Sequence, residues 1–170
     1  MTQTPPPSAS NGAGSPAPVF QLQRIYLKDA SLEMPHAPQI FLESGAPQIE
    51  VQLDVNHEQV SEGAIEVVVR VTATARVGEK VLFLIEAKQG GIFELRGIPE
   101  GQLGPVLGIV CPGIVYPYLR ANVADLLTRT GLPPIHLAEI NFEALFQQKS
   151  AQEAQGASGL IVPPASPTRQ

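Results

Sequence analysis

Few side chains in this sequence could do covalent or metal chemistry, and they lie far apart. Cys111 is the only cysteine, and the apolar run around it contains prolines. The three histidines, His36, His57 and His136, occur in separate loop-like contexts with no carboxylate at a telling spacing. A nucleophilic cysteine needs a neighbouring base, and zinc sites use paired cysteine or histidine spacings. We therefore expect no catalytic or metal site and interpret Cys111 as a small buried apolar residue.

The sequence also lacks the signatures of two common ligand classes. The glycine-containing stretch GQLGPVLG, at 101–108, matches neither standard phosphate-loop spacing. The formal net charge of −5 argues against nucleic acid and against an anionic membrane surface, because both need a basic patch. We expect no cofactor and no nucleic-acid partner.

Composition indicates a binding or assembly surface instead. Apolar residues make up 44% of the 170 residues, and charged residues only 16%. One small core does not hide that much apolar surface, so we expect oligomerisation or a binding surface.

Three features of the chain favour the cytoplasm. A single cysteine cannot form an intrachain disulfide. The N-terminus lacks the basic segment and apolar stretch of a secretory signal. The most apolar run, 104–119, contains three prolines and is shorter than a bilayer-spanning helix. We expect a cytoplasmic protein without direct membrane insertion.

Proline, serine, alanine and glycine mark the two ends of the chain. They dominate residues 1–19, and alanine, glutamine, glycine and proline prevail over 150–170. Neither segment has enough apolar area to offset the entropy of ordering it. We expect disordered tails at 1–19 and 150–170 around one domain at 20–149.

Within that domain, four runs have the residue pattern of β-strands. They are 20–33, 48–56, 64–77 and 80–89. The second alternates strictly, with Ile49, Val51 and Leu53 on its apolar side. Gly78 and Glu79 predict a tight turn between the last two runs. Short links of this kind favour an antiparallel sheet.

Two helical patterns follow the strands. Apolar residues at helical spacing predict a helix over 115–131, with Gly131 as a left-handed C-terminal cap. Asn141 predicts the N-cap of a last helix over 142–152, with Ile140 and Leu145 as a hydrophobic staple. Strands followed by helices predict an α+β fold, a four-stranded antiparallel sheet with helices packed on one face.

Two local features are ambiguous on sequence alone. Under a period of two, the run 20–33 has no cleanly polar face, because Ile25 and Leu27 share a side with Asp29 and Glu33. The paired glycines of QGGIFELRGI, 89–98, are expected to break a strand, either as a bulge or beside a groove lined by Ile92 and Phe93.

Four stretches, in this order, resemble the SecB family of bacterial protein-export chaperones. They are FQLQRIYLKDASLEMPHAP, EAKQGGIFELRGI, GIVCPGIVYPYLR and LAEINFEALF, and together they span about residues 20–148. The resemblance implies a chaperone that holds precursor proteins unfolded in the cytoplasm. It also implies delivery of these precursors to the SecA motor for export through the Sec translocase, and assembly as a homotetramer, a dimer of dimers.

The resemblance also implies roles for individual residues. Asp29, Glu33, Leu84 and Glu86 match positions through which SecB-like proteins dock SecA. By alternation the first two share one side of their strand and the last two one side of theirs, so we expect all four on the exposed face of the sheet.

A second set of matching positions concerns assembly and clients. Ile85, Ala87 and Gln89 match positions that support the tetramer. Ile49, Val51 and Leu53 match positions lining the client groove, and the aromatic residues Tyr26, Tyr118 and Phe146 are their expected neighbours. Some members carry a tryptophan in the loop after the first strand, where this chain has FLESGAPQ, so a shallower groove is implied.

Three other functions stay open at this point. A SecB-like chaperone of a toxin–antitoxin system would share the fold without needing SecA. A non-catalytic interaction module would bind one folded partner. The third alternative is a small enzyme with Cys111 in its active site. Alkylation of the thiol without loss of activity would exclude it.

Overall fold

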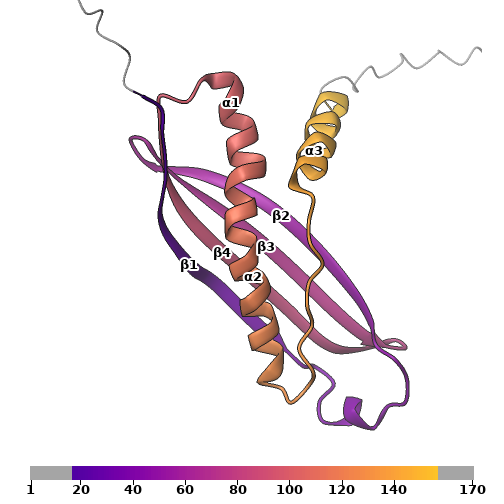
Figure 1. Cartoon of the computed structure of the whole chain (residues 1–170). Coiled ribbons are helices and arrows are strands. Elements are labelled where there is room, and N and C mark those ends of the chain that lie inside the picture. Colours follow the sequence, from indigo (N-terminus) through magenta and orange to yellow (C-terminus); the bar gives the residue numbers. More distant parts are fainter. Residues whose placement is uncertain (1–16, 157–170) are drawn as a thin grey trace, which may run out of the picture.

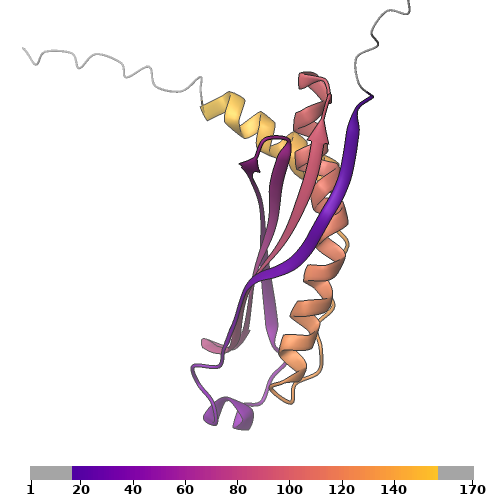
Figure 2. The ribbon, with the colours of Figure 1, turned by 90° about the vertical axis from the view of Figure 1, so that its left-hand side faces the viewer.

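Four long strands form one antiparallel sheet in the computed structural model, which describes residues 17–156 (Figure 1). In chain order they are β1 (Val19–Glu33), β2 (Gln48–Ser61), β3 (Ala64–Val77) and β4 (Lys80–Arg96). The order across the sheet is β1-β4-β3-β2, so β1 and β2 form its two edges. The predicted α+β architecture is confirmed, because the helices cover one face of this sheet (Figure 2).

Glycines at positive φ make the two tight hairpins of the sheet. Gly63, at φ 73°, turns β2 into β3, and Gly78, at φ 58°, turns β3 into β4. Left-handed backbone of this kind is open to glycine at little cost. A longer connection containing the short 3-10 helix η1 (Gln39–Leu42) joins β1 to β2.

The core lies between the helices and alternate residues of the two central strands. Val67, Val69 and Val71 on β3 have no exposed surface, and neither have Ile85 and Ala87 on β4. We call this side of the sheet the covered face and the opposite side the open face. The alternation in the two central strands follows the period of two that the sequence predicts.

The edge strand β1 departs from that period. Its register with β4 shifts between Leu22 and Arg24 and again between Leu27 and Asp29. Each shift inserts one extra residue and reverses which side the following residues face. The β1 residues paired with covered-face positions of β4 are Phe20, Leu22, Ile25, Leu27, Ala30 and Leu32. The prediction that both faces of β1 mix polar and apolar residues is therefore wrong. The two bulges place the apolar residues on one side of the strand and most of the polar residues on the other.

The paired glycines of β4 make room for side chains on both faces. A Cβ atom on Gly90 would lie 2.8 Å from Cζ of Tyr26, which crosses the open face. A Cβ atom on Gly91 would lie 2.8 Å from both Phe93 and Val115 on the covered face. Each glycine is thus required by a close approach rather than by its backbone angles.

The prediction that these glycines break the strand is wrong. β4 continues without interruption from Lys80 to Arg96. Ile92 and Phe93 also lie on opposite faces, and Phe93 is fully buried. They line no common groove.

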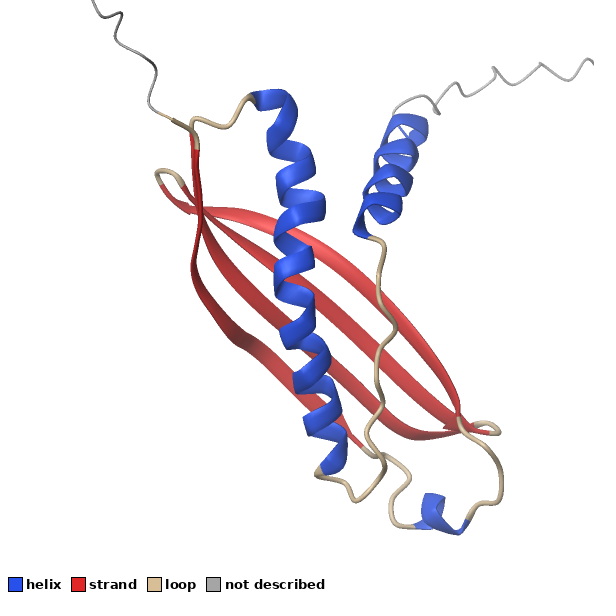
Figure 3. Ribbon diagram, viewed as in Figure 1, coloured by secondary structure: helices blue, strands red, loops and turns tan. Residues whose placement is uncertain are grey.

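One continuous helical rod packs across the sheet (Figure 3). It contains α1 (Glu100–Pro105), the π-helical turn η2 (Val106–Val110) and α2 (Cys111–Thr128). The helix predicted over 115–131 is therefore only the second half of the rod. The sequence misses the first half because three prolines normally end or kink helices.

The rod tolerates its prolines through local adjustments. Each proline stands four residues after a glycine, as Pro112 does after Gly108 and Pro117 after Gly113. The carbonyl that loses its donor therefore belongs to a residue with no side chain to hinder its tilt. The π-helical turn absorbs further irregularity, as such turns do in other kinked helices.

The rod is apolar around much of its circumference. It has 29 residues and, by length and composition alone, could cross a membrane. Its 18-residue apolar segment has a mean hydropathy of 1.3, and 33% of that segment is buried in the structure. Its sheet-facing residues Val115, Leu119 and Val123 have no exposed surface, so packing on the sheet accounts for that side.

The chain returns along the covered face before it forms α3 (Phe142–Gly156) (Figure 1). Oδ1 of Asn141 accepts a hydrogen bond from the backbone N–H of Ala144 at 3.0 Å, which confirms the predicted N-cap. α3 continues to Gly156, so residues 150–156 do not begin a disordered tail as predicted. The remaining tail predictions, for 1–16 and 157–170, lie outside the described residues.

Candidate functional site

Four residues predicted for docking share the open face. Glu33 and Leu84 are register partners on β1 and β4. On the same two strands, Glu86 pairs with Ser31. Asp29 pairs with Lys88. The structure therefore places Asp29, Glu33, Leu84 and Glu86 in one patch across two neighbouring strands, which we call the docking patch.

Two basic residues that the sequence analysis did not single out belong to the same patch. Nζ of Lys88 lies 3.1 Å from Asp29 and 3.9 Å from Glu86, and Arg70 lies 2.7 Å from Glu86. Exposed pairs of this kind contribute about 0 to 1 kcal/mol each, so a basic partner can exchange with them at little cost. The alternation of β3 and β4 in the sequence already predicts that Arg70 and Lys88 lie on the open face, so the sequence pattern alone could have identified them.

A buried carboxylate lies beside the docking patch. Glu66 is only 5% exposed and accepts hydrogen bonds from the hydroxyl of Tyr26 and from Nζ of Lys28, the latter at 2.7 Å. Burial acts to raise the pKa of Glu66, but the hydrogen bonds from Lys28 and Tyr26 outweigh it and lower that pKa. Burial and the neighbouring carboxylate raise the pKa of Tyr26 to about 12.

This contact corrects the assignment of Tyr26 to the client groove. The bulges of β1 place Tyr26 opposite Gly90 on the open face. Ile49, Val51 and Leu53 are partners of covered-face residues of β3. The sheet therefore separates Tyr26 from the residues it was expected to adjoin.

The covered side of the edge strand β2 is partly uncovered. Ile49 is 44% exposed and Val51 48% exposed, whereas Leu53 is half-buried. The rod packs on β4, β3 and β1 and leaves this outer strand free (Figure 1). We call Ile49, Val51 and Leu53 the β2 strip.

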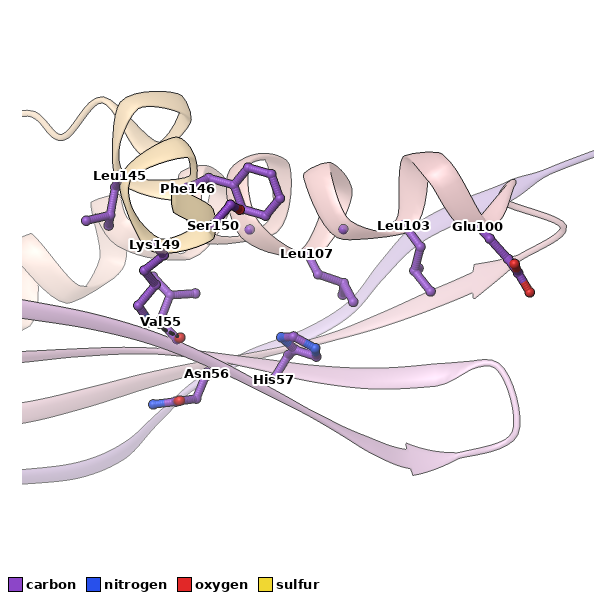
Figure 4. A pocket seen from close by; sticks show the side chains of 12 residues that line it. Val55, Asn56, His57, Glu100, Leu103, Leu107, Leu145, Phe146, Lys149 and Ser150 are labelled. Atoms are coloured by element: carbon purple, nitrogen blue, oxygen red, sulfur yellow. Dashed lines mark hydrogen bonds between the residues drawn. The ribbon is translucent and has the colours of Figure 1, made fainter. Parts of the chain in front are cut away.

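A cleft continues from the end of the β2 strip. It has a volume of about 500 Å³ between β2, the first half of the rod and α3 (Figure 4). Its lining includes Phe146, which extends from α3 toward the rod, together with Leu107 of the rod and Val55 of β2. A Cβ atom on Gly108 would overlap the ring of Phe146, so the glycine allows α3 to approach the rod.

Tyr118 is not brought together with the β2 strip. Tyr116 donates a hydrogen bond to the carbonyl of Ala138 at 2.6 Å and packs edge-on against Phe142, on the side of the returning chain. Tyr118 follows Tyr116 by two positions, which corresponds to a rotation of about 200° around the helix axis, so the two side chains point in nearly opposite directions. Tyr118 is therefore turned away from β2, and 51% of it is exposed.

The three residues expected to support the tetramer form no surface. Ile85 and Ala87 have no exposed area, and Gln89 is 2% exposed beneath α2. Oε1 of Gln89 accepts a hydrogen bond from Nδ2 of Asn122 at 2.6 Å. These residues face the helix layer, so any influence on assembly acts through the position of α2, and their role in a tetramer stays a prediction.

The residues considered first for chemistry remain isolated. Cys111 has no exposed surface, and burial raises the pKa of its thiol to about 12, so the thiol stays protonated at neutral pH. His36 lies 3.1 Å from the carbonyl oxygen of Val81. Among residues 17–156, no cluster of three or more histidine, cysteine or acidic side chains could hold a metal ion.

Comparison with known proteins agrees with this arrangement of sheet and rod. At the level of fold, the SecB-like chaperone of Mycobacterium tuberculosis, solved in complex with a peptide from an antitoxin, superposes with a TM-score of 0.60. The two sequences are 17% identical, and the superposition covers 71% of this chain and 90% of the other. The fold is thus that of a SecB-like chaperone.

Sequence comparison identifies the family. The model of the preprotein translocase subunit SecB matches residues 13–153. The protein-export protein SecB of Methylibium petroleiphilum is 61% identical over 142 residues, which cover 82% of this chain and 87% of the relative. That of Bordetella pertussis is 56% identical over 166 residues, covering 93% and 94%. The chain belongs to the SecB family and is a protein-export chaperone.

The buried carboxylate generates a prediction about pH. Glu66→Gln should lower the free energy of unfolding at pH 7 by about 1 to 3 kcal/mol, because a neutral amide with one oxygen replaces the charged carboxylate that accepts the hydrogen bonds from Tyr26 and Lys28. The folded-state pKa of Glu66 is lowered, so its contribution is complete above the unfolded pKa of about 4.3. It is lost as the pH falls through the folded pKa.

Thermal unfolding of both proteins between pH 3 and pH 7 measures this effect. The difference in Tm should narrow steadily below pH 4. Glu58→Gln is the matched control, because Glu58 is the register partner of Glu66 but is exposed. A Tm difference for Glu66→Gln that is equal at pH 3 and pH 7 would show that the ionised network does not stabilise the sheet.

Proposed function

We propose that this chaperone holds precursor proteins unfolded in the cytoplasm and delivers them to SecA for export through the Sec translocase. The observation that carries the proposal is the separation of two surfaces by one sheet. The exposed apolar β2 strip lies on the covered side, and the charged docking patch lies on the open side. A chaperone with this arrangement can contact a client and the motor at the same time.

The β2 strip and the adjoining cleft are the proposed client surface. Exposed apolar side chains on an extended strand suit short apolar segments of many sequences. Such binding acts by mass action, because a ligand that binds only the unfolded client opposes its folding. Several weak contacts along one chain then raise the overall affinity through effective concentration. This mechanism involves no catalysis and no nucleotide.

The docking patch is the proposed contact for SecA. Asp29, Glu33 and Glu86 supply negative charge, and Leu84 supplies an apolar centre among them. Arg70 and Lys88 neutralise part of that charge in the free chain. Docking would therefore replace intramolecular ion pairs by intermolecular ones, and its rate should depend strongly on salt.

We also propose that the chain assembles as a homotetramer, a dimer of dimers. Val110 and Tyr118 are large apolar residues on the rod that remain 45% and 51% exposed. Packing of two helix layers against each other would cover this surface. Light scattering should give a mass near four times the 18.1 kDa of the chain. A monomer mass at micromolar concentration would contradict the assembly.

One alternative has a specific observation in its favour. The structural neighbour from Mycobacterium tuberculosis was solved with an antitoxin peptide. A chaperone dedicated to a toxin–antitoxin system would bind that one partner and would not need SecA. The names and high identity of the curated relatives favour export. A panel of unrelated unfolded proteins separates these functions, because a dedicated chaperone should ignore most of the panel.

The docking proposal predicts a selective loss. Reversing charge at Asp29, Glu33 and Glu86 should weaken SecA binding by at least tenfold, because attraction becomes repulsion. Suppression of client aggregation should not change. Titration with SecA and a light-scattering assay with a slow-folding precursor measure the two activities. If both fall equally, the open face has a structural role instead.

The client proposal predicts the opposite pattern. Ile49→Ser with Val51→Ser should abolish suppression of aggregation, because the exposed apolar area is lost. The Tm should fall by only a few degrees, since both side chains are about half exposed. Gln52→Ser, on the other face of the same strand, is the matched control. Unfolding of the double variant would assign the two residues to the core.

A further inference from the structure

The second bulge of β1 adjoins the docking patch. Leu27 pairs with Gln89 and Asp29 pairs with Lys88, so Lys28 between them has no register partner. Bulges often re-aim the side chains that follow them. The position of the extra residue therefore determines which side chain of β1 lies opposite Lys88.

The apolar pattern of β1 allows this bulge at two positions. If it lay one residue further along, Asp29 would be the extra residue and Lys28 would lie opposite Lys88. Residues 30–33 would keep their present partners on β4 in both cases, so the burial of the apolar side chains does not distinguish the two positions. A further contact must decide between them.

Glu66 supplies a contact that distinguishes the two positions. It belongs to β3, and β4 lies between this strand and β1. Nζ of Lys28 lies 2.7 Å and 2.9 Å from the two carboxylate oxygens of Glu66, and the hydroxyl of Tyr26 donates to one of these oxygens. We call Tyr26, Lys28 and Glu66 the Glu66 clamp. It connects β1 to a strand that is not adjacent to it, and it draws Lys28 away from Lys88.

The sheet is shaped to admit this clamp. A Cβ atom on Gly90 of β4 would lie 2.8 Å from Cζ of Tyr26, so the ring can cross β4 only because position 90 has no side chain. Gly90 does not have the positive φ that would by itself favour glycine. The glycine therefore serves the contact between Tyr26 and Glu66.

The clamp constrains β1 more strongly than the exposed ion pairs do. Glu66 is 5% exposed, so loss of its partners would leave a charge in a poorly solvated place. The pair between Asp29 and Lys88 is more exposed, with 56% and 33% of the two side chains accessible, and such pairs contribute little. The position of the bulge is thus set from Glu66 rather than from Asp29.

The place of the clamp in the chain indicates its function, because Asp29 of the docking patch directly follows Lys28. We propose that the Glu66 clamp fixes the second bulge of β1 at Lys28 and thereby holds Asp29 in position for SecA. Tyr26, Lys28 and Glu66 are then positioning residues, which act through Asp29 and need no contact with the partner. The inference rests on the proposed docking function and names what sets the geometry of the docking patch.

A double-mutant cycle on the full-length chain tests the proposal. Lys28→Met with Glu66→Gln removes the ion pair without leaving a buried charge. The net charge stays the same, so the long-range attraction to SecA is retained. Titration with SecA measures the cost of Asp29→Asn in the original chain and in this clamp variant. Glu33→Gln, on the same strand beyond the bulge, is the matched control.

Asp29→Asn should weaken SecA binding about fivefold in the original chain and less than about twofold in the clamp variant, because the carboxylate is no longer held in place. Glu33→Gln should have the same cost in both chains, since Glu33 pairs with Leu84 wherever the bulge lies. This selectivity distinguishes positioning of Asp29 from a general contribution to stability.

Three results would overturn the proposal. An equal cost of Asp29→Asn in the two chains would show that the clamp does not position this residue. An equal fall in the costs of Asp29→Asn and Glu33→Gln would show that β1 has loosened as a whole. Asp29→Asn without effect in the original chain would remove the docking role of Asp29, and this inference with it.

Tyr26→Phe provides a milder background if the clamp variant does not fold. It removes one hydroxyl group and keeps both the ring over Gly90 and the ion pair of Lys28 with Glu66. The cost of Asp29→Asn should fall to an intermediate value of about threefold. A cost equal to that in the original chain would contradict the proposal.

Hydrogen exchange gives a readout that does not involve SecA. In the clamp variant, exchange should become faster at the amides of residues 27–29, where the bulge can move. It should stay the same at residues 30–33, whose pairing is common to both positions of the bulge. Uniformly faster exchange along β1 would show that the clamp only stabilises the strand as a whole, against the proposal.

Discussion

The packing of one helical rod against one face of the sheet is the constraint on which the other features depend. The fully buried valines of β3 and the buried residues of β4 share one core cluster with Val115, Leu119 and Val123 of α2, which packs on both strands. A single rod spans three strands of the sheet and does not cover the fourth. The exposure of Ile49 and Val51 is thus a geometric consequence of covering four long strands with one helix.

The open face is organised by charge rather than by apolar packing. Lys28 and Tyr26 hold the buried carboxylate of Glu66, and Lys88 and Arg70 pair with the exposed carboxylates. The buried pair stabilises the sheet, because a carboxylate without partners would be costly at that depth. The exposed pairs contribute little and are replaceable. One face can therefore be rigid at one end and available to a partner at the other.

Much of the fold follows from sequence patterns that are local. Strict alternation predicts β2 and β3, glycines predict the hairpin turn at Gly78, and Asn141 predicts the start of α3. Each of these signals depends on residues a few positions apart. The sequence resemblance contributes the family and the grouping of the docking patch.

The sequence-based predictions that are wrong concern segments whose local structure depends on residues far away in the chain. The bulges of β1 depend on its register with β4, some 60 to 70 residues away, so a fixed period misplaced Tyr26. The rod runs through Pro105, Pro112 and Pro117 because packing on the sheet outweighs their cost. Whether an apolar residue such as Ile85 forms core or interface depends on the helix above it, which alternation cannot show.

The central claim is that clients and SecA contact opposite faces of one sheet. Methyl NMR of the full chain tests it most directly, with Ile49, Val51 and Leu53 reporting on one face and Leu84 on the other. An unfolded client should shift the first three signals and leave Leu84 unchanged, and SecA should do the reverse. Displacement of all four signals by either ligand alone would contradict the separation of the two surfaces.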